Sequence, residues 1–174
     1  MAEAPSRLTV SVSTDILAMW RRPRTVVARQ LAQGVREERA LAILLAGCLL
    51  VFIGRLPILQ RGVVLAGEEG NFLRDVSYSF LGLMILAPIL FYGLAALGRL
   101  IALAFGLRAS GHGARLALFW AYLSAAPAAL LYGLVLGLAG PGPGAQITGA
   151  VWLVAFLIFW TTGLRVAGGG EQHA

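Results

Sequence analysis

Four long apolar tracts, separated by short polar or charged segments, are the main feature of the chain. Crossing a bilayer as a helix takes about 20 predominantly apolar residues, and residues 76–98 reach this length without a charge. Residues 116–164 are also free of charge, and they are about twice as long as one crossing requires. The Gly-Pro-Gly-Pro-Gly segment at 140–144 breaks this tract, because repeated Pro and Gly cannot continue a helix in lipid. The pattern predicts an all-α membrane protein, a bundle of about four transmembrane helices at about 40–59, 76–98, 116–139 and 145–164.

The first predicted span is the least regular of the four. Its uninterrupted apolar part, Ala40 to Gly54, is shorter than one crossing requires. We expect Arg55 to extend its side chain outward to the membrane surface, and Pro57 to mark the end of the helix. Residues 60–75 are then predicted to form a polar loop, and Arg99 to lie at the opposite interface after the second span.

Residues 1–39 mix apolar and basic positions and are predicted to form a cytoplasmic, amphipathic N-terminal segment. Thr14 or Asp15 is suited to cap a short helix, and Pro23 suits the first turn of a second one. Two such helices would lie along the membrane, with Trp20 at the level of the head groups. The predicted contacts with the membrane surface or a partner are Trp20, Arg21, Arg22, Arg24 and Arg29.

Composition and charge restrict the class of protein further. Hydrophobic residues make up 59% of the chain and charged residues 13%, with a mean hydropathy of +0.81, which excludes an ordinary soluble domain. The net charge of +6 comes from fourteen arginines and no lysine, and seven of the arginines lie in residues 1–39. Because this basic segment adjoins a hydrophobic span, anionic lipid head groups are the predicted partners and nucleic acid is not.

The distribution of arginine predicts the orientation. Residues 1–39 and 99–115 are rich in arginine, whereas the other two connections are balanced or uncharged. The positive-inside rule therefore predicts that both termini are cytoplasmic, with residues 166–174 as a flexible tail. Residues 1–39 also lack the apolar segment and small-residue cleavage site of a secretory signal, so no cleaved signal peptide is expected.

The sequence offers no constellation for catalysis, cofactor binding or metal binding. An enzyme needs a nucleophile and base, or metal ligands, on facing elements, and no such set occurs in the predicted spans. Glu68 and Glu69 are interpreted as solvated loop residues, and His112 as part of a flexible turn. The predicted membrane core also lacks the ionisable groups that transport of a charged substrate usually needs.

Small residues and prolines in the spans suggest how the helices pack. We expect the two prolines, Pro88 and Pro127, to kink their helices, which either opens a groove for a lipid or a partner helix or only shapes the bundle. The third span carries small residues at helical spacing, which suit close packing inside the bundle or a seam between two copies of the chain. These predicted packing residues are Ala121, Ser124, Ala125, Ala128, Gly133 and Gly137.

Five stretches of the chain have a recognisable pattern: Trp20–Arg24, Arg36–Ala42, Leu86–Pro88, Gly113–Trp120 and Ala126–Pro127. Through these stretches, residues 15–165 are similar to bacterial members of the Yip family, the Ypt- and Rab-interacting multispanning membrane proteins. The resemblance implies a multispanning membrane domain over residues 40–165, and it implies no catalytic residues. The alanine-, glycine- and arginine-rich usage suits a GC-rich bacterium, which would place the protein in the inner membrane.

Two hypotheses of function follow. The first is a non-catalytic scaffold or accessory protein that binds lipids and another membrane protein, or a second copy of itself. The second is an oligomeric transporter of a lipid or small molecule along the kinked helices. A packed bundle with an apolar lateral groove would favour the first hypothesis, and a water-lined cavity across the bundle would favour the second.

Overall fold

The structure is a computed structural model that describes residues 12–34, 36–67, 70–107 and 109–169. Every regular element in this part of the chain is helical, which confirms the predicted all-α class. Two short helices precede the long ones, and the second long helix is made of three consecutive segments. The elements are α1 Val12–Met19, α2 Pro23–Leu31, α3 Glu37–Ala66, α4 Phe72–Leu81, the π-helix η2 Gly82–Leu86, α5 Ala87–Ala104, α6 Gly111–Ala139 and α7 Pro143–Gly169.

Four of these helical stretches are long and apolar enough to cross a membrane, as predicted. They are α3, the continuous α4–η2–α5 stretch, α6 and α7, and each has a window of 18 residues with a mean hydropathy between 1.7 and 2.4. Each is longer than its predicted span because the helix continues into flanking turns. The chain is a multi-pass helical membrane protein.

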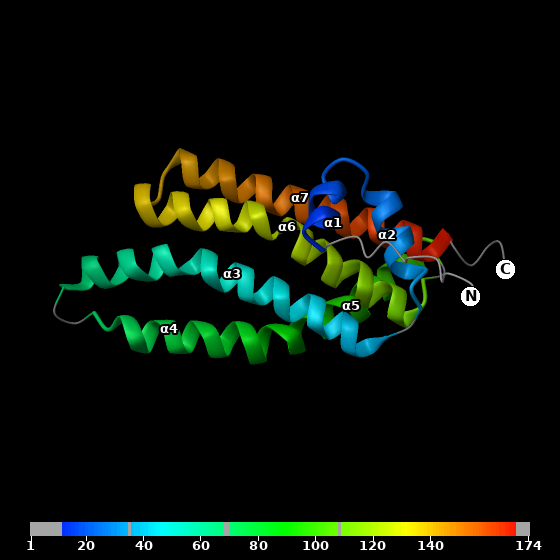
Figure 1. Ribbon diagram of the computed structural model, residues 1–174, viewed down its shortest axis with the longest axis horizontal. Helices are drawn as coiled ribbons and strands as arrows, with labels where there is room; N and C mark the ends of the chain where they lie inside the picture. The colour runs from blue at the N-terminus through cyan, green and yellow to red at the C-terminus, as the bar shows by residue number, and fades with distance from the viewer. Residues whose placement is uncertain (1–11, 35, 68–69, 108, 170–174) are drawn as a thin grey trace, which may run out of the picture.

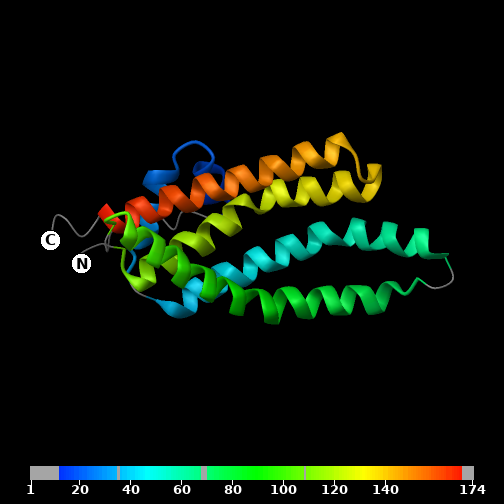
Figure 2. The same ribbon diagram turned by 180° about the vertical axis from the view of Figure 1, so that it is seen from behind.

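The long helices alternate in direction, so the start of α3 and the end of α7 lie at the same end of the molecule (Figure 1). We call this the N-terminal end, because α1 and α2 also lie there, and we call the opposite end the turn end. Helix α6 packs between α3 and α7 and is the most buried of the four spanning stretches, whereas α4–η2–α5 is the least buried (Figure 2). The core of the bundle therefore follows α6.

The prediction that the first span ends near Pro57 is wrong. Helix α3 continues through Pro57 to Ala66, and α4 begins at Phe72, so most of the predicted 60–75 loop is helical. A proline removes one hydrogen bond from a helix, and packing against a neighbouring helix can compensate for that loss. Here α6 approaches Pro57 so closely that a Cβ atom on Gly137 would lie 2.4 Å from the proline Cβ.

Three smaller boundaries also differ from the predictions. His112 lies in the first turn of α6, because the Ser110 hydroxyl accepts a hydrogen bond of 3.1 Å from the Gly113 amide and caps the helix. The predicted tail at 166–174 is helical as far as Gly169, and the remaining residues lie outside the described part. Thr14 and Asp15 do not cap α1, because the helix begins before them.

Candidate functional site

The N-terminal helix pair, which we define as α1, α2 and their connection (residues 12–31), packs against α6 and α7. As predicted, Pro23 lies in the first turn of its second helix. The apolar side chains of Met19, Val26 and Val27 are at most 2% exposed, because they pack into the core of the bundle. This face of the helix pair is therefore occupied by the protein itself and is not free to enter lipid.

Trp20 fixes the connection between α1 and α2 to the bundle. Its indole Nε1 donates a hydrogen bond of 3.1 Å to the backbone carbonyl of Ser124 in α6. Its ring meets that of Phe159 in α7 edge to face, with 5.3 Å between the centroids. Because Pro127 has no N–H, the carbonyl of Leu123 lacks its usual helical donor. The carbonyl of Ser124, which accepts the hydrogen bond from Trp20, is the next one along the chain. Trp20 is still 43% exposed, so part of its ring can contact a lipid or a partner.

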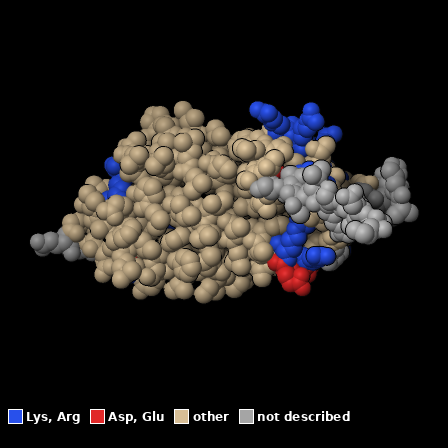
Figure 3. All heavy atoms as spheres, viewed as in Figure 1, with Lys and Arg blue, Asp and Glu red and all other residues tan. Residues whose placement is uncertain are grey.

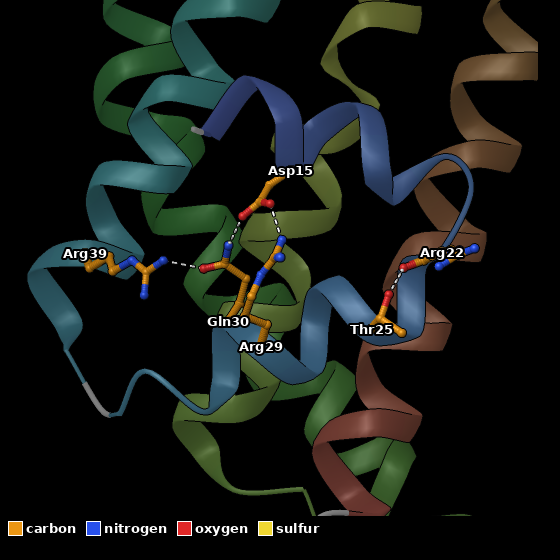
Figure 4. A network of polar contacts seen from close by, with 6 residues as sticks. All are labelled: Asp15, Arg22, Thr25, Arg29, Gln30 and Arg39. Atoms are coloured by element: carbon orange, nitrogen blue, oxygen red, sulfur yellow. Dashed lines mark hydrogen bonds and ion pairs between the residues drawn. The ribbon is translucent and has the colours of Figure 1, made fainter. Parts of the chain in front are cut away.

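A buried polar network joins the two short helices to α3 (Figure 4). Asp15 forms an ion pair with Arg29 and accepts a hydrogen bond of 2.8 Å from the Gln30 side-chain amide. The carbonyl of that amide accepts a hydrogen bond from Arg39 of α3. Asp15 and Gln30 are 3% and 2% exposed, and polar groups buried to this degree need such partners. The network therefore holds the helix pair in one position.

A second polar cluster fixes α3 to α6 at the same end of the molecule. Glu37, in the first turn of α3, forms an ion pair with Arg115 and lies 3.1 Å from Nδ1 of His112. His112 thus has a role in joining two helices, which its place in a glycine-rich segment did not suggest.

Three of the predicted arginines, Arg21, Arg22 and Arg24, are exposed around the connection between α1 and α2. Arg29 differs because it pairs with Asp15, although its side chain is still 44% exposed. In Figure 3, most of the basic atoms lie at the N-terminal end, and a broad uncharged area separates them from a smaller basic group at the turn end. This arrangement places cationic groups next to apolar surface, as at the boundary between head groups and acyl chains.

An apolar groove of about 540 Å³ runs from the helix pair along the outer face of α7. Trp20 and Pro23 form one wall, and branched aliphatic side chains of α7 form the other. Two of the exposed arginines, Arg21 and Arg22, lie between Trp20 and Pro23 in the chain. The α7 residues that line the groove are Ile147, Ala150, Val151, Val154, Ala155, Ile158 and Phe159.

The predicted packing residues all lie in the buried part of α6. Ala121, Ser124, Ala125 and Ala128 are at most 7% exposed. The two glycines contact α3, and a Cβ atom on Gly133 would lie 1.8 Å from the backbone oxygen of Gly54. The structure therefore uses this row of small residues inside one copy of the chain.

The two predicted kink residues occupy different positions in their helices. Pro127 is inside α6, which changes direction along its length in Figures 1 and 2. Pro88 follows the π-helix η2, where the Ala87 amide donates to the carbonyl of Gly82. Since Pro88 cannot donate to the carbonyl of Met84, a wider helical turn at this point is consistent with its missing N–H.

No group of three or more His, Cys, Asp or Glu side chains that could hold a metal ion occurs in the part of the chain that the structure describes. Glu68 and Glu69, which we interpreted as loop residues, lie outside that part. The single cysteine, Cys48, is buried in α3. The features of the described residues at the N-terminal helix pair are therefore cationic side chains, an exposed indole and an apolar groove.

These features define a multi-pass helical membrane protein with a docked N-terminal helix pair. The chain matches no protein-family model, no curated protein and no solved structure. The resemblance to the Yip family therefore stays a prediction from the sequence.

Proposed function

We propose that this chain is a non-catalytic, Yip-like scaffold or accessory protein of a bacterial inner membrane, with both termini in the cytoplasm. Its N-terminal helix pair would form the contact surface for anionic lipid and for a membrane-protein partner or a second copy of the chain. Neither a cofactor nor nucleic acid has a role in this proposal.

One observation carries the proposal: the helix pair is held rigidly while it presents cations beside an apolar groove. The buried network at Asp15 and the Trp20 hydrogen bond hold the pair against the bundle. Arg21, Arg22 and Arg24 remain exposed, and they adjoin in the chain Trp20 and Pro23, which line the groove. Arginine side chains that only determined topology would not need such a fixed position, since the positive-inside rule depends on charge alone.

The transporter hypothesis has less support. From Leu116 to Ala126 every residue of α6 is buried, so the centre of the bundle is packed along this stretch. The apolar groove along α7 opens on the lateral surface, where lipid would surround it. A packed core with a lateral groove is the arrangement that favours a scaffold.

Lipid binding can be tested with the purified full chain and a photoreactive phosphatidylglycerol, followed by peptide mapping of the cross-links. We expect cross-links within residues 12–31 at low salt. Each arginine near an anionic surface contributes about 1 kcal/mol, so R21Q/R22Q should weaken binding about thirtyfold. The control R74Q/R165Q removes the same charge from two other exposed positions and should keep these cross-links. Equal losses in the two variants would contradict a specific role for the helix pair.

Partner binding needs a separate experiment. The wild type, R21Q/R22Q and R74Q/R165Q can be captured from membranes in mild detergent, and the proteins that copurify can be identified. A partner of the helix pair should copurify with the wild type and the control and be depleted from R21Q/R22Q. A set of copurifying proteins that is the same for all three forms would argue against this surface as the protein contact.

A further inference from the structure

Arg55 lies on a part of the molecule that the proposed function does not use. It lies in α3, six residues before Arg61, which corresponds to about 9 Å along the helix. Arg61 reaches the turn between α6 and α7, because its guanidinium occupies the space that a Cβ atom on Gly140 would need. The backbone of Arg55 therefore lies one to two helical turns closer to the middle of the bundle than the backbone of Arg61, which marks the turn end.

The neighbours of Arg55 belong to the apolar segments of α3 and α6. Gly54, which precedes it, is in contact with Gly133 of α6, and both belong to apolar segments of their helices. The Arg55 side chain is exposed on the lateral surface, where its Nε donates a hydrogen bond of 3.2 Å to the hydroxyl of Ser79. None of the acidic residues that the structure describes forms an ion pair with it.

An arginine in this position is suited to bind an anionic group. A charged side chain at membrane depth is costly, and such residues pair with another charge, reach a water-filled cavity or extend to the interface. The nearest described partner is a neutral hydroxyl, which leaves the positive charge without compensation by the protein. The guanidinium offers several further N–H donors in a planar fork that matches the oxygens of a phosphate.

The surface beside Arg55 has the shape and polarity for the rest of a lipid. A lateral groove of about 260 Å³ has Arg55 and Ser79 at its polar end. From there the chain continues through η2 into α5 and away from the turn end, so the apolar lining extends toward the middle of the bundle. A π-helical turn is uncommon and often occurs at functional sites. The remaining lining residues are Gly82, Leu83, Leu86, Ala87 and Leu90.

We propose that Arg55 and Ser79 bind the phosphate of an anionic phospholipid from the leaflet at the turn end of the molecule, and that one acyl chain lies along Leu83, Leu86 and Leu90. The positive charge of Arg55 and the apolar groove that extends from it toward the middle of the bundle match the two parts of such a lipid. This site is at the opposite end from the N-terminal helix pair, so it can exist whether or not that pair binds lipid.

The test uses the full chain in mild detergent with photoreactive phosphatidylglycerol, and it measures cross-links to residues 79–90. R55Q should reduce these cross-links about tenfold, the effect expected when a charged hydrogen-bond donor is removed. R55K keeps the charge and should retain part of the binding. R74Q removes a nearby exposed charge at the same end and should have no effect. Cross-links to residues 12–31 should be unchanged in R55Q, which separates this site from the helix pair.

Two further comparisons keep the proposal testable if R55Q fails to fold. Leu86→Trp fills the groove without changing the charge and should also reduce the cross-links to residues 79–90.

Competition should require both parts of the lipid, so neither glycerol 3-phosphate nor diacylglycerol should displace the probe as well as unlabelled phosphatidylglycerol does. Full displacement by glycerol 3-phosphate would show a site for a soluble phosphate, and full displacement by diacylglycerol would show an apolar groove without head-group recognition. Either result, or equal cross-linking of R55Q and R74Q in folded protein, would overturn the proposal.

Discussion

Single glycines determine how closely α3 and α6 approach each other. Gly133 and Gly137 occupy positions where any side chain would collide with the backbone of α3 or with Pro57. Close backbone approach is the usual reason for small residues between membrane helices, because it increases van der Waals contact. By contrast, a Cβ atom on Gly93 in α5 would meet nothing within 4 Å.

The pair of variants G133A and G93A tests this contact. In G133A the new Cβ atom would lie 1.8 Å from the carbonyl oxygen of Gly54, so the helices must separate. Overpacking of this kind costs about 1–3 kcal/mol, and we expect a lower midpoint of thermal unfolding in detergent. G93A should be neutral or slightly stabilising, because alanine is favoured over glycine in a helix. An unchanged midpoint for G133A would contradict the close contact between α3 and α6.

The elements of this chain differ in how much of their position comes from local sequence. The four spans could be predicted because apolar length and Pro-Gly breaks are properties of consecutive residues. The continuation of α3 through Pro57 could not be predicted, because it depends on contact with Gly137 about eighty residues later. The buried position of Asp15 was missed for a similar reason, since its partners Arg29 and Gln30 come from α2, and Gln30 is itself bound by Arg39 of α3.

In the candidate site, too, some features could be predicted from local sequence and others depend on contacts between distant residues. Basic and apolar alternation in residues 14–34 predicted two short helices near Pro23, and the structure contains them. The sequence also indicated Trp20 and the arginines, but it did not show that Arg29 would pair with Asp15. Pairing between helices depends on their relative rotation, which a single sequence does not specify. The groove along α7 could not be predicted either, since it exists only when the helix pair is docked.

Docking of the N-terminal helix pair should depend on Asp15. Asp15→Ala removes the ion pair with Arg29 and leaves the Gln30 amide buried without its acceptor, a loss of about 1–3 kcal/mol. We expect faster amide hydrogen exchange across residues 12–31, while the exchange of α6 stays slow. Asp75→Ala is the control, because its ion pair with Arg74 is solvent-exposed and contributes about 0–1 kcal/mol. Equal exchange in the wild type and Asp15→Ala would show that the network does not hold the pair.

At the scale of the whole molecule, the direction of the helices and the placement of charge are related. Four alternating spans bring the start of α3 and the end of α7 to one end, where the N-terminal helix pair also lies (Figure 1). Arg21, Arg22, Arg24 and Arg115 belong to that end, whereas α6 and α7 join through an uncharged turn at the opposite one. An excess of arginine at one end is what the positive-inside rule requires of the cytoplasmic side.

Labelling of introduced cysteines in intact cells tests this orientation together with the number of spans. The only natural cysteine, Cys48, is fully buried, so the wild type should not react with a membrane-impermeant maleimide. Gln33→Cys places a thiol at the N-terminal end, between α2 and α3, and Pro141→Cys places one in the turn between α6 and α7; both positions are exposed. We expect Pro141→Cys to be labelled in cells whose inner membrane is intact, and Gln33→Cys only after that membrane is permeabilised. The reverse pattern would agree with three crossings between the two residues but contradict the orientation. Labelling of both thiols in intact cells would place them on the same side of the membrane, which needs an even number of crossings between residues 33 and 141. This fold has three crossings there, so in that case one of α3, α4–η2–α5 and α6 could not span the bilayer.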